Sequence, residues 1–180
     1  MCQFKSAIVC RDEREKCGFK LHLSPWTESH SEIEQLFNDR DRGKNLAKVE
    51  FSPDSMSTAH QVETYKFKID EARTPAWFTS EMQESVQDRM SKYIASIIVS
   101  GEVSILMGGQ FIIAPGAKVS NVKQALIMAV CDNATVSDVC GNATVSGVRG
   151  NATVSGVWDN ATVSDVCDNA KIVDDKRVKK

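Results

Sequence analysis

The second residue of the chain, Cys2, is the residue whose type and position most directly suggest chemistry. Methionine is usually removed when the residue after it is small, and removal of Met1 would leave the Cys2 thiol beside a free α-amino group. An α-amino group with an unperturbed pKa of about 7.7–8.0 can act as the general base that activates a neighbouring nucleophile. Cys2 is therefore our candidate catalytic residue, and an amidohydrolase or transferase is the activity that it would serve.

Few other residues in the sequence support this candidate. Class II glutamine amidotransferases also begin Met-Cys, but Gln3 stands where that family has glycine, and none of its later motifs is found. The histidines His22, His30 and His60 are scattered, and their spacing does not show whether any of them meets Cys2. No P-loop, GxGxxG, HExxH or GxSxG motif occurs. The alternative is that Cys2 is a small apolar residue at the start of a strand, so the choice between enzyme and non-enzyme stays open.

The composition argues against several classes of partner and cofactor. The six cysteines form no CxxC pair, so we expect no zinc site, no other metal and no cofactor. A net charge of -2 gives no basic field, so nucleic acid is not an expected partner. No apolar run approaches the ~20 residues that span a bilayer, and residues 1–14 lack the apolar core of a signal peptide. We therefore expect no membrane partner and a cytoplasmic protein with reduced cysteines.

A nine-residue repeat occupies most of the last third of the chain. Its first full copy reads Asn133-Ala-Thr-Val-Ser-Asp-Val-Cys-Gly. Thr, Val, Ser, Gly and Asn are mediocre or poor helix formers, and a period of nine is not a heptad, which argues against a helix. The repeat also lacks the Gly-Gly-x-Gly-x-Asp calcium ligands of β-roll nonapeptides. Seven copies can be traced, which begin at Gly116 (one residue short), Gln124, Asn133, Asn142, Asn151, Asn160 and Asn169.

The spacing inside each copy predicts a β-solenoid. Ala134 and Val136 are two residues apart, so on a strand they share one face, and Thr135 points to the other. Asp138, or Gly in other copies, bends the chain so that Val139 returns to the interior, and the Gly-Asn or Asp-Asn pair between copies supplies a second bend. One copy cannot bury its own Ala and Val, but stacked copies can. Two copies per coil would give roughly eighteen residues per turn.

The eighth position of each copy varies and provides our candidate binding residues, Arg149 and Trp158. An exposed Trp beside an Arg is typical of an interaction anchor. The alternatives are sequence drift at an unconstrained corner or packing against the N-terminal domain. With two copies per coil, the variable residues fall on two edges, with Cys131, Arg149 and Cys167 on one and Cys140 and Trp158 on the other.

Residues 1–115 are predicted to form an α+β domain of antiparallel strands with two helices. A capping box, Ser29 to Glu32, opens the first helix, whose inner face would be Ile33, Leu36 and Phe37. A stripe of apolar residues at helical spacing predicts the longer helix over 80–99. Period-two alternation predicts strands over 4–10, 19–23, 47–51 and 65–69.

The two ends of the solenoid, over residues 116–175, also have expected caps. Residues 103–113 are predicted to form a hairpin-like pair around Gly108-Gly109 that caps the first coil. The charged segment from Asp174 to Lys180, which includes a basic tail over 176–180, is expected to blunt the other end.

Three features together resemble a group of uncharacterised proteins of bacteria and their phages. They are the opening Met1-Cys-Gln-Phe-Lys-Ser6, the segment Pro75-Ala-Trp77-Phe78 before a helix, and the Asn-Ala-Thr-Val copies at the end. The resemblance implies a bacterial or prophage setting and supplies no activity.

The sequence therefore favours a non-enzymatic binding or assembly module that uses a rigid β-solenoid surface. The expected partner is a protein, with self-association as one form of it. The alternative is an N-terminal-cysteine amidohydrolase or transferase that acts through Cys2. A third hypothesis is a phage antagonist of host defence that sequesters a ligand or a nuclease.

Overall fold

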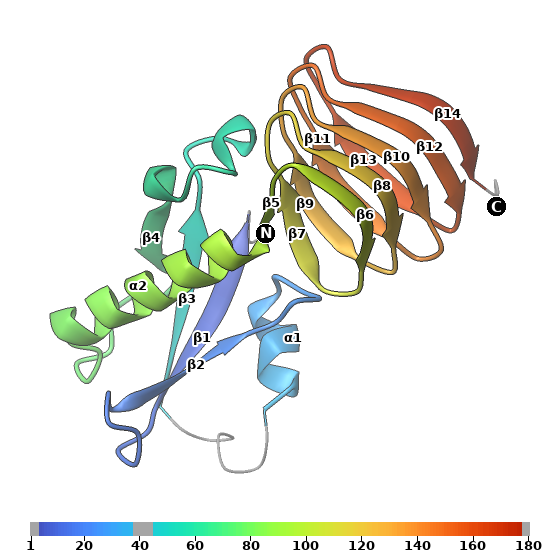
Figure 1. Ribbon diagram of the computed structural model, residues 1–180. Helices are drawn as coiled ribbons and strands as arrows, with labels where there is room; N and C mark the ends of the chain where they lie inside the picture. Colours follow the sequence, from blue (N-terminus) through green and yellow to red (C-terminus); the bar gives the residue numbers. More distant parts are fainter. Residues whose placement is uncertain (1–3, 38–44, 178–180) are drawn as a thin grey trace. The chain divides into compact units, whose positions relative to one another are not determined.

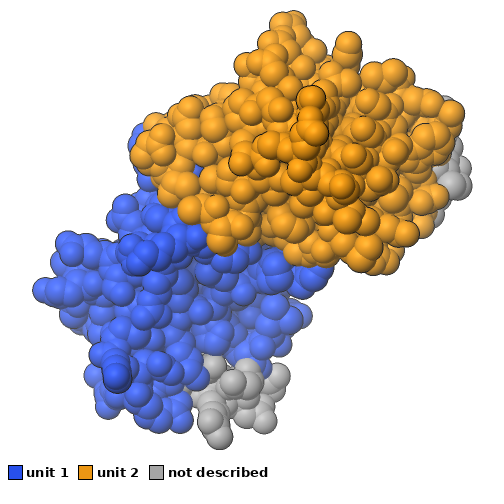
Figure 2. Space-filling model, in the orientation of Figure 1, with its two compact units in different colours: residues 1–53, 65–93 blue, residues 54–64, 94–180 orange. Residues whose placement is uncertain are grey.

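The computed structural model describes residues 4–37 and 45–177. The chain divides into two compact units, residues 1–53 with 65–93 and residues 54–64 with 94–180 (Figure 2). The first unit is an antiparallel sheet with helices, and the second is a β-solenoid (Figure 1). The predicted fold class is confirmed.

Four antiparallel strands form the sheet of the first unit, in the order β2-β1-β3-β4. The strands are β1 (Lys5–Arg11), β2 (Phe19–Leu23), β3 (Leu46–Ser52) and β4 (Lys66–Ile69). Buried and half-buried residues alternate along β3, as the period-two pattern predicted. The central strand β1 is buried along all but its last residue, because both faces of the sheet are covered there.

The helix α1 (His30–Gln35) covers one face of this sheet. The N-cap half of the predicted capping box is confirmed, since the Ser29 side chain accepts a hydrogen bond from the Glu32 backbone N–H at 3.4 Å. The reciprocal half is replaced, because the Ser29 N–H donates to Thr27 Oγ1 at 3.1 Å and the Glu32 carboxylate accepts from the Thr27 hydroxyl. Ile33 and Phe37 pack on the strand residues Ile8 and Cys10.

The prediction that Leu36 belongs to the inner face of α1 was wrong, because its side chain is 67% exposed. The helix ends at Gln35, and Leu36 is the C-cap residue. Because the helix has only six residues, few of its side chains can face the sheet. Ile33 does so from within the helix, and Phe37, which follows the C-cap, packs in the same cluster.

The helix α2 (Ser80–Ile97) lies over the opposite face of the sheet. Its predicted apolar stripe is confirmed, with Val86 and Met90 buried in the first unit and Ile94 in the second. The guanidinium of Arg89 stacks on the Phe19 ring at 4.8 Å.

The second unit consists of two parallel sheets of five strands each. We name them the even sheet and the odd sheet after their strand numbers. The even sheet contains β6 (Glu102–Met107), β8 (Lys118–Lys123), β10 (Thr135–Cys140), β12 (Thr153–Asp159) and β14 (Lys171–Arg177). The odd sheet contains β5 (Ile98–Val99), β7 (Gln110–Ile113), β9 (Leu126–Val130), β11 (Thr144–Val148) and β13 (Thr162–Val166).

The register between strands shows two copies in each coil. Val136 of β10 pairs with Val154 of β12, eighteen residues further along the chain. The same Val136 pairs on its other side with Val119, one residue closer in the sequence, because the copy that begins at Gly116 is one residue short.

The interior of the solenoid is made of alanine and valine columns. Ala134, Val136 and their equivalents in the coils above and below are fully buried. Full burial of one valine contributes roughly 1.5–3 kcal/mol, and only stacking provides that burial.

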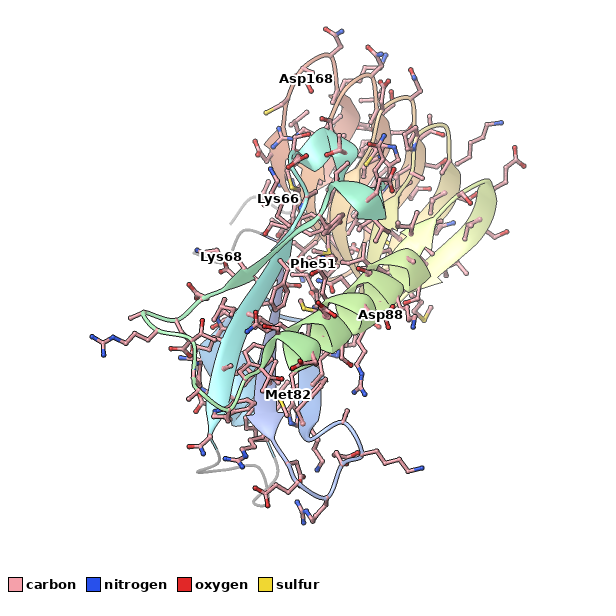
Figure 3. The ribbon with its side chains drawn as sticks, turned by 90° about the vertical axis from the view of Figure 1, so that its left-hand side faces the viewer. Phe51, Lys66, Lys68, Met82, Asp88 and Asp168 are labelled. Atoms are coloured by element: carbon pink, nitrogen blue, oxygen red, sulfur yellow. The ribbon has the colours of Figure 1, made fainter. Side chains whose placement is uncertain are left out.

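The corners between copies take left-handed backbone angles, as the Gly-Asn and Asp-Asn pairs predicted. Gly150 has φ +65° and Asp168 has φ +62°. Asp168 lies at a corner of the solenoid (Figure 3), and its Oδ2 accepts a hydrogen bond at 3.0 Å from the backbone N–H of Gly150, eighteen residues earlier in the chain. Asp159 makes the equivalent bond to the Gly141 N–H at 3.1 Å on the other edge. Side chains therefore connect successive coils at both corners.

The predicted hairpin over residues 103–113 was wrong. β6 belongs to the even sheet and β7 to the odd sheet, and each pairs in parallel with the next coil. Gly108 and Gly109, with φ +64° and +73°, carry the chain around a corner instead of reversing it. The parallel coils therefore begin at β5, before the recognisable copy at Gly116.

The segment 54–64, which connects β3 to β4, belongs to the second unit and packs on the odd sheet. It contains two short 3-10 turns, Met56–Thr58 and Val62–Thr64. The Met56 methyl group lies over Gly147 of β11, at 3.5 Å from the position that a Cβ would occupy there. This segment therefore covers part of the outer face of the odd sheet.

Candidate functional site

The outer face of the even sheet is an array of side chains in fixed register. Two rows of side chains run across the strands. The first contains charged and hydroxyl side chains, and the second begins with the exposed Ile105 of β6. The first row is Glu102, Lys118, Thr135, Thr153 and Lys171. The second row is Ile105, Asn121, Asp138, Gly156 and Asp174.

Trp158 is held in one orientation on this face. Its Nε1 donates a hydrogen bond to Asp138 Oδ1 at 2.7 Å, and the ammonium group of Lys176 lies 4.8 Å from the centre of its ring. The ring is half-buried and crosses over Gly156, where a Cβ would lie 2.5 Å from Trp158 Nε1. The glycine is therefore what allows the indole to reach Asp138.

We expect Gly156→Ala to lower the free energy of unfolding by about 1–3 kcal/mol, because the new methyl group would push Trp158 away from Asp138. The matched control is Gly147→Ala, at the same position of the preceding copy, where the nearest atom would be 3.5 Å away. That contact is ordinary van der Waals packing, so this variant should stay close to wild type. Urea denaturation compares the two, and equal losses would show that the Trp158–Asp138 contact has no role.

Arg149 lies on the other edge of the coil, away from Trp158. It follows β11, and its guanidinium forms an ion pair with Asp165 of the next coil. The hydrogen bond from Arg149 lowers the pKa of the Asp165 carboxyl. Only 15% of the Arg149 side chain is exposed, so it connects two coils at this edge, and the structure does not bring the two candidate binding residues together.

Cys2, the candidate catalytic residue, lies outside the described residues. Of the three histidines, His22 stacks on Phe37, and the His30 ring contacts the Val49 carbonyl at 3.1 Å and Asp70 at 3.4 Å. His60 belongs to the segment 54–64. His22 and His30 therefore lie in the first unit, each with its own contacts, and His60 lies in the second.

A buried polar cluster surrounds Lys5 in the first unit and was not predicted from the sequence. The Lys5 side chain is 0% exposed, and its Nζ donates to the Ser24 carbonyl at 2.5 Å and to Glu28 Oε1 at 3.1 Å. Glu28 Oε2 also accepts from the Ser6 N–H at 2.7 Å. β2 ends at Leu23, opposite Ala7, so this carboxylate takes the place of the missing strand partner.

Burial changes the ionisation of this cluster. Desolvation lowers the pKa of Lys5, and the nearby Glu28 carboxylate offsets part of that shift. The Lys5 ammonium group lies 5.0 Å from the centre of the Tyr93 ring on α2. Burial, with a smaller effect of Glu28, raises the pKa of Tyr93 to about 12. The one signal in the sequence was Lys5 on the same strand as the apolar run 7–10, and alternation alone placed it on a face without showing that the face is covered.

Cys131 is fully buried in the second unit, at the end of β9. Burial raises the pKa of its thiol to about 11. A hydrogen bond from the His60 backbone acts in the opposite direction and is the smaller effect. Cys131 therefore stays a neutral thiol at physiological pH.

This shift predicts an alkaline loss of stability of about 2–3 kcal/mol. The unfolded chain loses the Cys131 proton near pH 9 and the folded chain only near pH 11, so stability should fall as the pH rises between these values. Cys131→Ala should lack the part of the stability loss that Cys131 causes. Tyr93 and the other cysteines titrate in both proteins, so the difference between the two stability curves isolates Cys131. Unfolding free energies at intervals from pH 8 to pH 11 provide the comparison, and parallel curves would contradict the assignment.

Within residues 4–37 and 45–177, no group of three or more His, Cys, Asp or Glu side chains is placed to hold a metal ion. Within the same residues, no helix has the length and apolar character needed to cross a membrane.

Comparison of the chain with models of known protein families, with curated proteins and with solved structures found no match.

Proposed function

We propose that this protein is a non-enzymatic binding or assembly module that presents the outer face of its even sheet to a protein partner. The observation that supports this most directly is Trp158, an aromatic side chain held by Asp138 and Lys176 on a rigid sheet. Aromatic residues fixed before binding lose little side-chain entropy and often dominate interface energies. The α+β unit would recognise a second partner.

The distribution of exposed apolar side chains supports the choice of this face. Ile105 and Met107 on β6 and Val173 on β14 are all exposed strand residues of the even sheet. Part of the odd sheet is covered by the segment 54–64 instead. The cytoplasm and a bacterial or phage origin are the setting that the sequence and its resemblance favour.

Site-specific photo-crosslinking tests this proposal. A photoreactive residue at Ser155, exposed on β12, the strand that also contains Trp158, should capture a protein in the cells of origin, and Trp158→Ala should reduce the yield at least about tenfold. The matched control is Ser164, equally exposed on β13 of the odd sheet, which should capture nothing above background. Capture at Ser164 alone, or a yield at Ser155 that does not depend on Trp158, would count against the even sheet as the binding face.

A second candidate is an N-terminal-cysteine amidohydrolase or transferase that acts through Cys2. Its support is the buried ion pair of Lys5 with Glu28, in which the pKa of the lysine is lowered. Lys5 is three residues after Cys2 in the chain. Perturbed titratable groups of this kind gather at active sites as well as in structural ion pairs. Ser6 adds a buried hydroxyl that has no hydrogen-bond partner among the described residues.

Mass spectrometry tests the second candidate. Met1 should be absent from the purified protein, and iodoacetamide should label Cys2 far faster than the half-buried Cys17, Cys140 and Cys167. Cys10 and Cys131 should label slowest, because both are fully buried and burial raises the pKa of the Cys131 thiol to about 11. Retention of Met1, or labelling of Cys2 no faster than Cys17, would remove the enzyme from consideration.

The third hypothesis is an antagonist of host defence that sequesters a ligand or a nuclease, and its support is the bacterial or prophage setting that the resemblance implies. A pulldown from infected cells should then recover such a partner, and recovery of none would count against it.

A further inference from the structure

The last described coil of the solenoid, formed by β13 and β14, has strand edges on which another chain could stack. Each strand is the outermost of its sheet, and no strand within residues 4–37 and 45–177 pairs with its outer edge. The core is also less covered there, since Val166 is 38% exposed while its equivalent in the preceding coil, Val148, is 0% exposed. Regular parallel edges with apolar interiors are templates for the addition of another chain.

One inward column of the even sheet changes character in this last coil. Val122, Val139 and Val157 follow one another in register and are fully buried. The next residue in the same column is Asp175 of β14. A carboxylate therefore occupies the position that three preceding coils fill with valine.

The charges on β14 form ion pairs with one another along the strand. Asp175 pairs with Arg177, and Asp174 pairs with Lys176 at 2.8 Å. The Asp175 side chain is 39% exposed, so water still solvates this pair. A strand added beyond β14 would enclose Asp175, which continues the inward valine column, and would remove water from its ion pair with Arg177. The mutual attraction of the two charges does not compensate for that lost hydration.

We infer that β14 is a charged terminal strand that prevents a second copy of this chain from stacking on the end of the solenoid. The inference goes beyond the proposed function, because it concerns the end of the coil stack and not the outer face of the even sheet. Self-association through continuous parallel sheets is thereby disfavoured, although β13 and β14 otherwise have the backbone geometry for it. Asp175 is the principal residue, because it places a charge in an apolar column.

The test is Asp175→Val in the full chain, which restores the valine of the preceding coils. Sedimentation velocity over a concentration series should show that this variant associates at a concentration at least tenfold lower than wild type. Its thermal midpoint should not fall, since the substitution extends an apolar column that already exists. Asp175→Asn, which removes the charge but stays polar, should lie between the two proteins.

The matched control is Lys171→Val, which introduces the same residue on the outer face of the same strand. It should sediment as wild type. If Asp175→Val associates no more strongly than wild type, or unfolds, or if Lys171→Val associates equally, the inference is overturned. Because the readout compares each variant with wild type, it does not depend on whether a separate protein binds the outer face, so the two proposals can fail independently.

Discussion

Val154→Asp is expected to lower the free energy of unfolding by more than about 5 kcal/mol and so to unfold the solenoid. Val154 is fully buried between Val136 and Ile172 in the central column of the even sheet. An aspartate there either carries an unpaired charge in an apolar interior or takes up a proton at a high cost. Far-UV circular dichroism and urea denaturation of the full chain measure the loss.

The neighbouring residue provides the control. Ser155 is exposed on the opposite side of the same strand, so Ser155→Asp should change stability by no more than about 0.5 kcal/mol. Val154→Thr keeps the shape and buries one hydroxyl, and it should lose about 1–3 kcal/mol, which remains measurable if the aspartate variant does not fold. Similar losses at the two positions would contradict the inward and outward assignment of the whole repeat.

Glu28→Gln is expected to lower the free energy of unfolding by about 3–5 kcal/mol. The substitution keeps an oxygen that can accept from the Ser6 N–H, but it leaves the fully buried Lys5 ammonium without its counter-charge. This loss has an upper limit, because Lys5 can release its proton instead of keeping an unpaired charge in the interior. The release costs about 1.4 kcal/mol for each unit between the pH of the solution and the ordinary lysine pKa of 10.5.

The dependence on pH distinguishes this cause from simple loss of packing. A lysine whose folded pKa is lowered binds more protons in the unfolded chain, so stability rises with pH between the lowered value and 10.5. The deficit of Glu28→Gln relative to wild type should therefore shrink as the pH rises from 7 toward 10. The double variant Lys5→Met/Glu28→Gln should lose much less than the sum of the single variants. A deficit that does not change with pH, together with additive losses, would show that the charge of Lys5 is unimportant.

The nine-residue copies allowed the solenoid to be predicted in considerable detail. Ala134 and Val136 point inward, partners lie eighteen residues apart, and the corners are left-handed. This detail could be predicted because each coil contacts only the coils next to it. The spacing of residues within the repeat therefore also gives the spacing between strands that pair. The first unit has no such period, and there the strands and the Ser29 cap were predictable while Leu36 was not.

The candidate site could be predicted only in part. The eighth position of each copy identified Trp158 and Arg149 as variable corner residues, but not that each is held by an aspartate of another coil. Those partners lie sixteen to twenty residues away and depend on which coil is stacked on which. The Lys5–Glu28 pair was missed for a similar reason, since nothing near Lys5 in the chain shows that α2 and Glu28 enclose it.

The sequence by itself determined the solenoid, since alanine and valine repeated at fixed intervals can be buried only by stacking. Only the tertiary structure decided where the coils begin, that Gly108-Gly109 joins two sheets, and that the segment 54–64 packs on the odd sheet. The physical reason is that a repeat encodes its own neighbours, whereas a single strand, corner or loop takes its environment from residues that are distant in the chain.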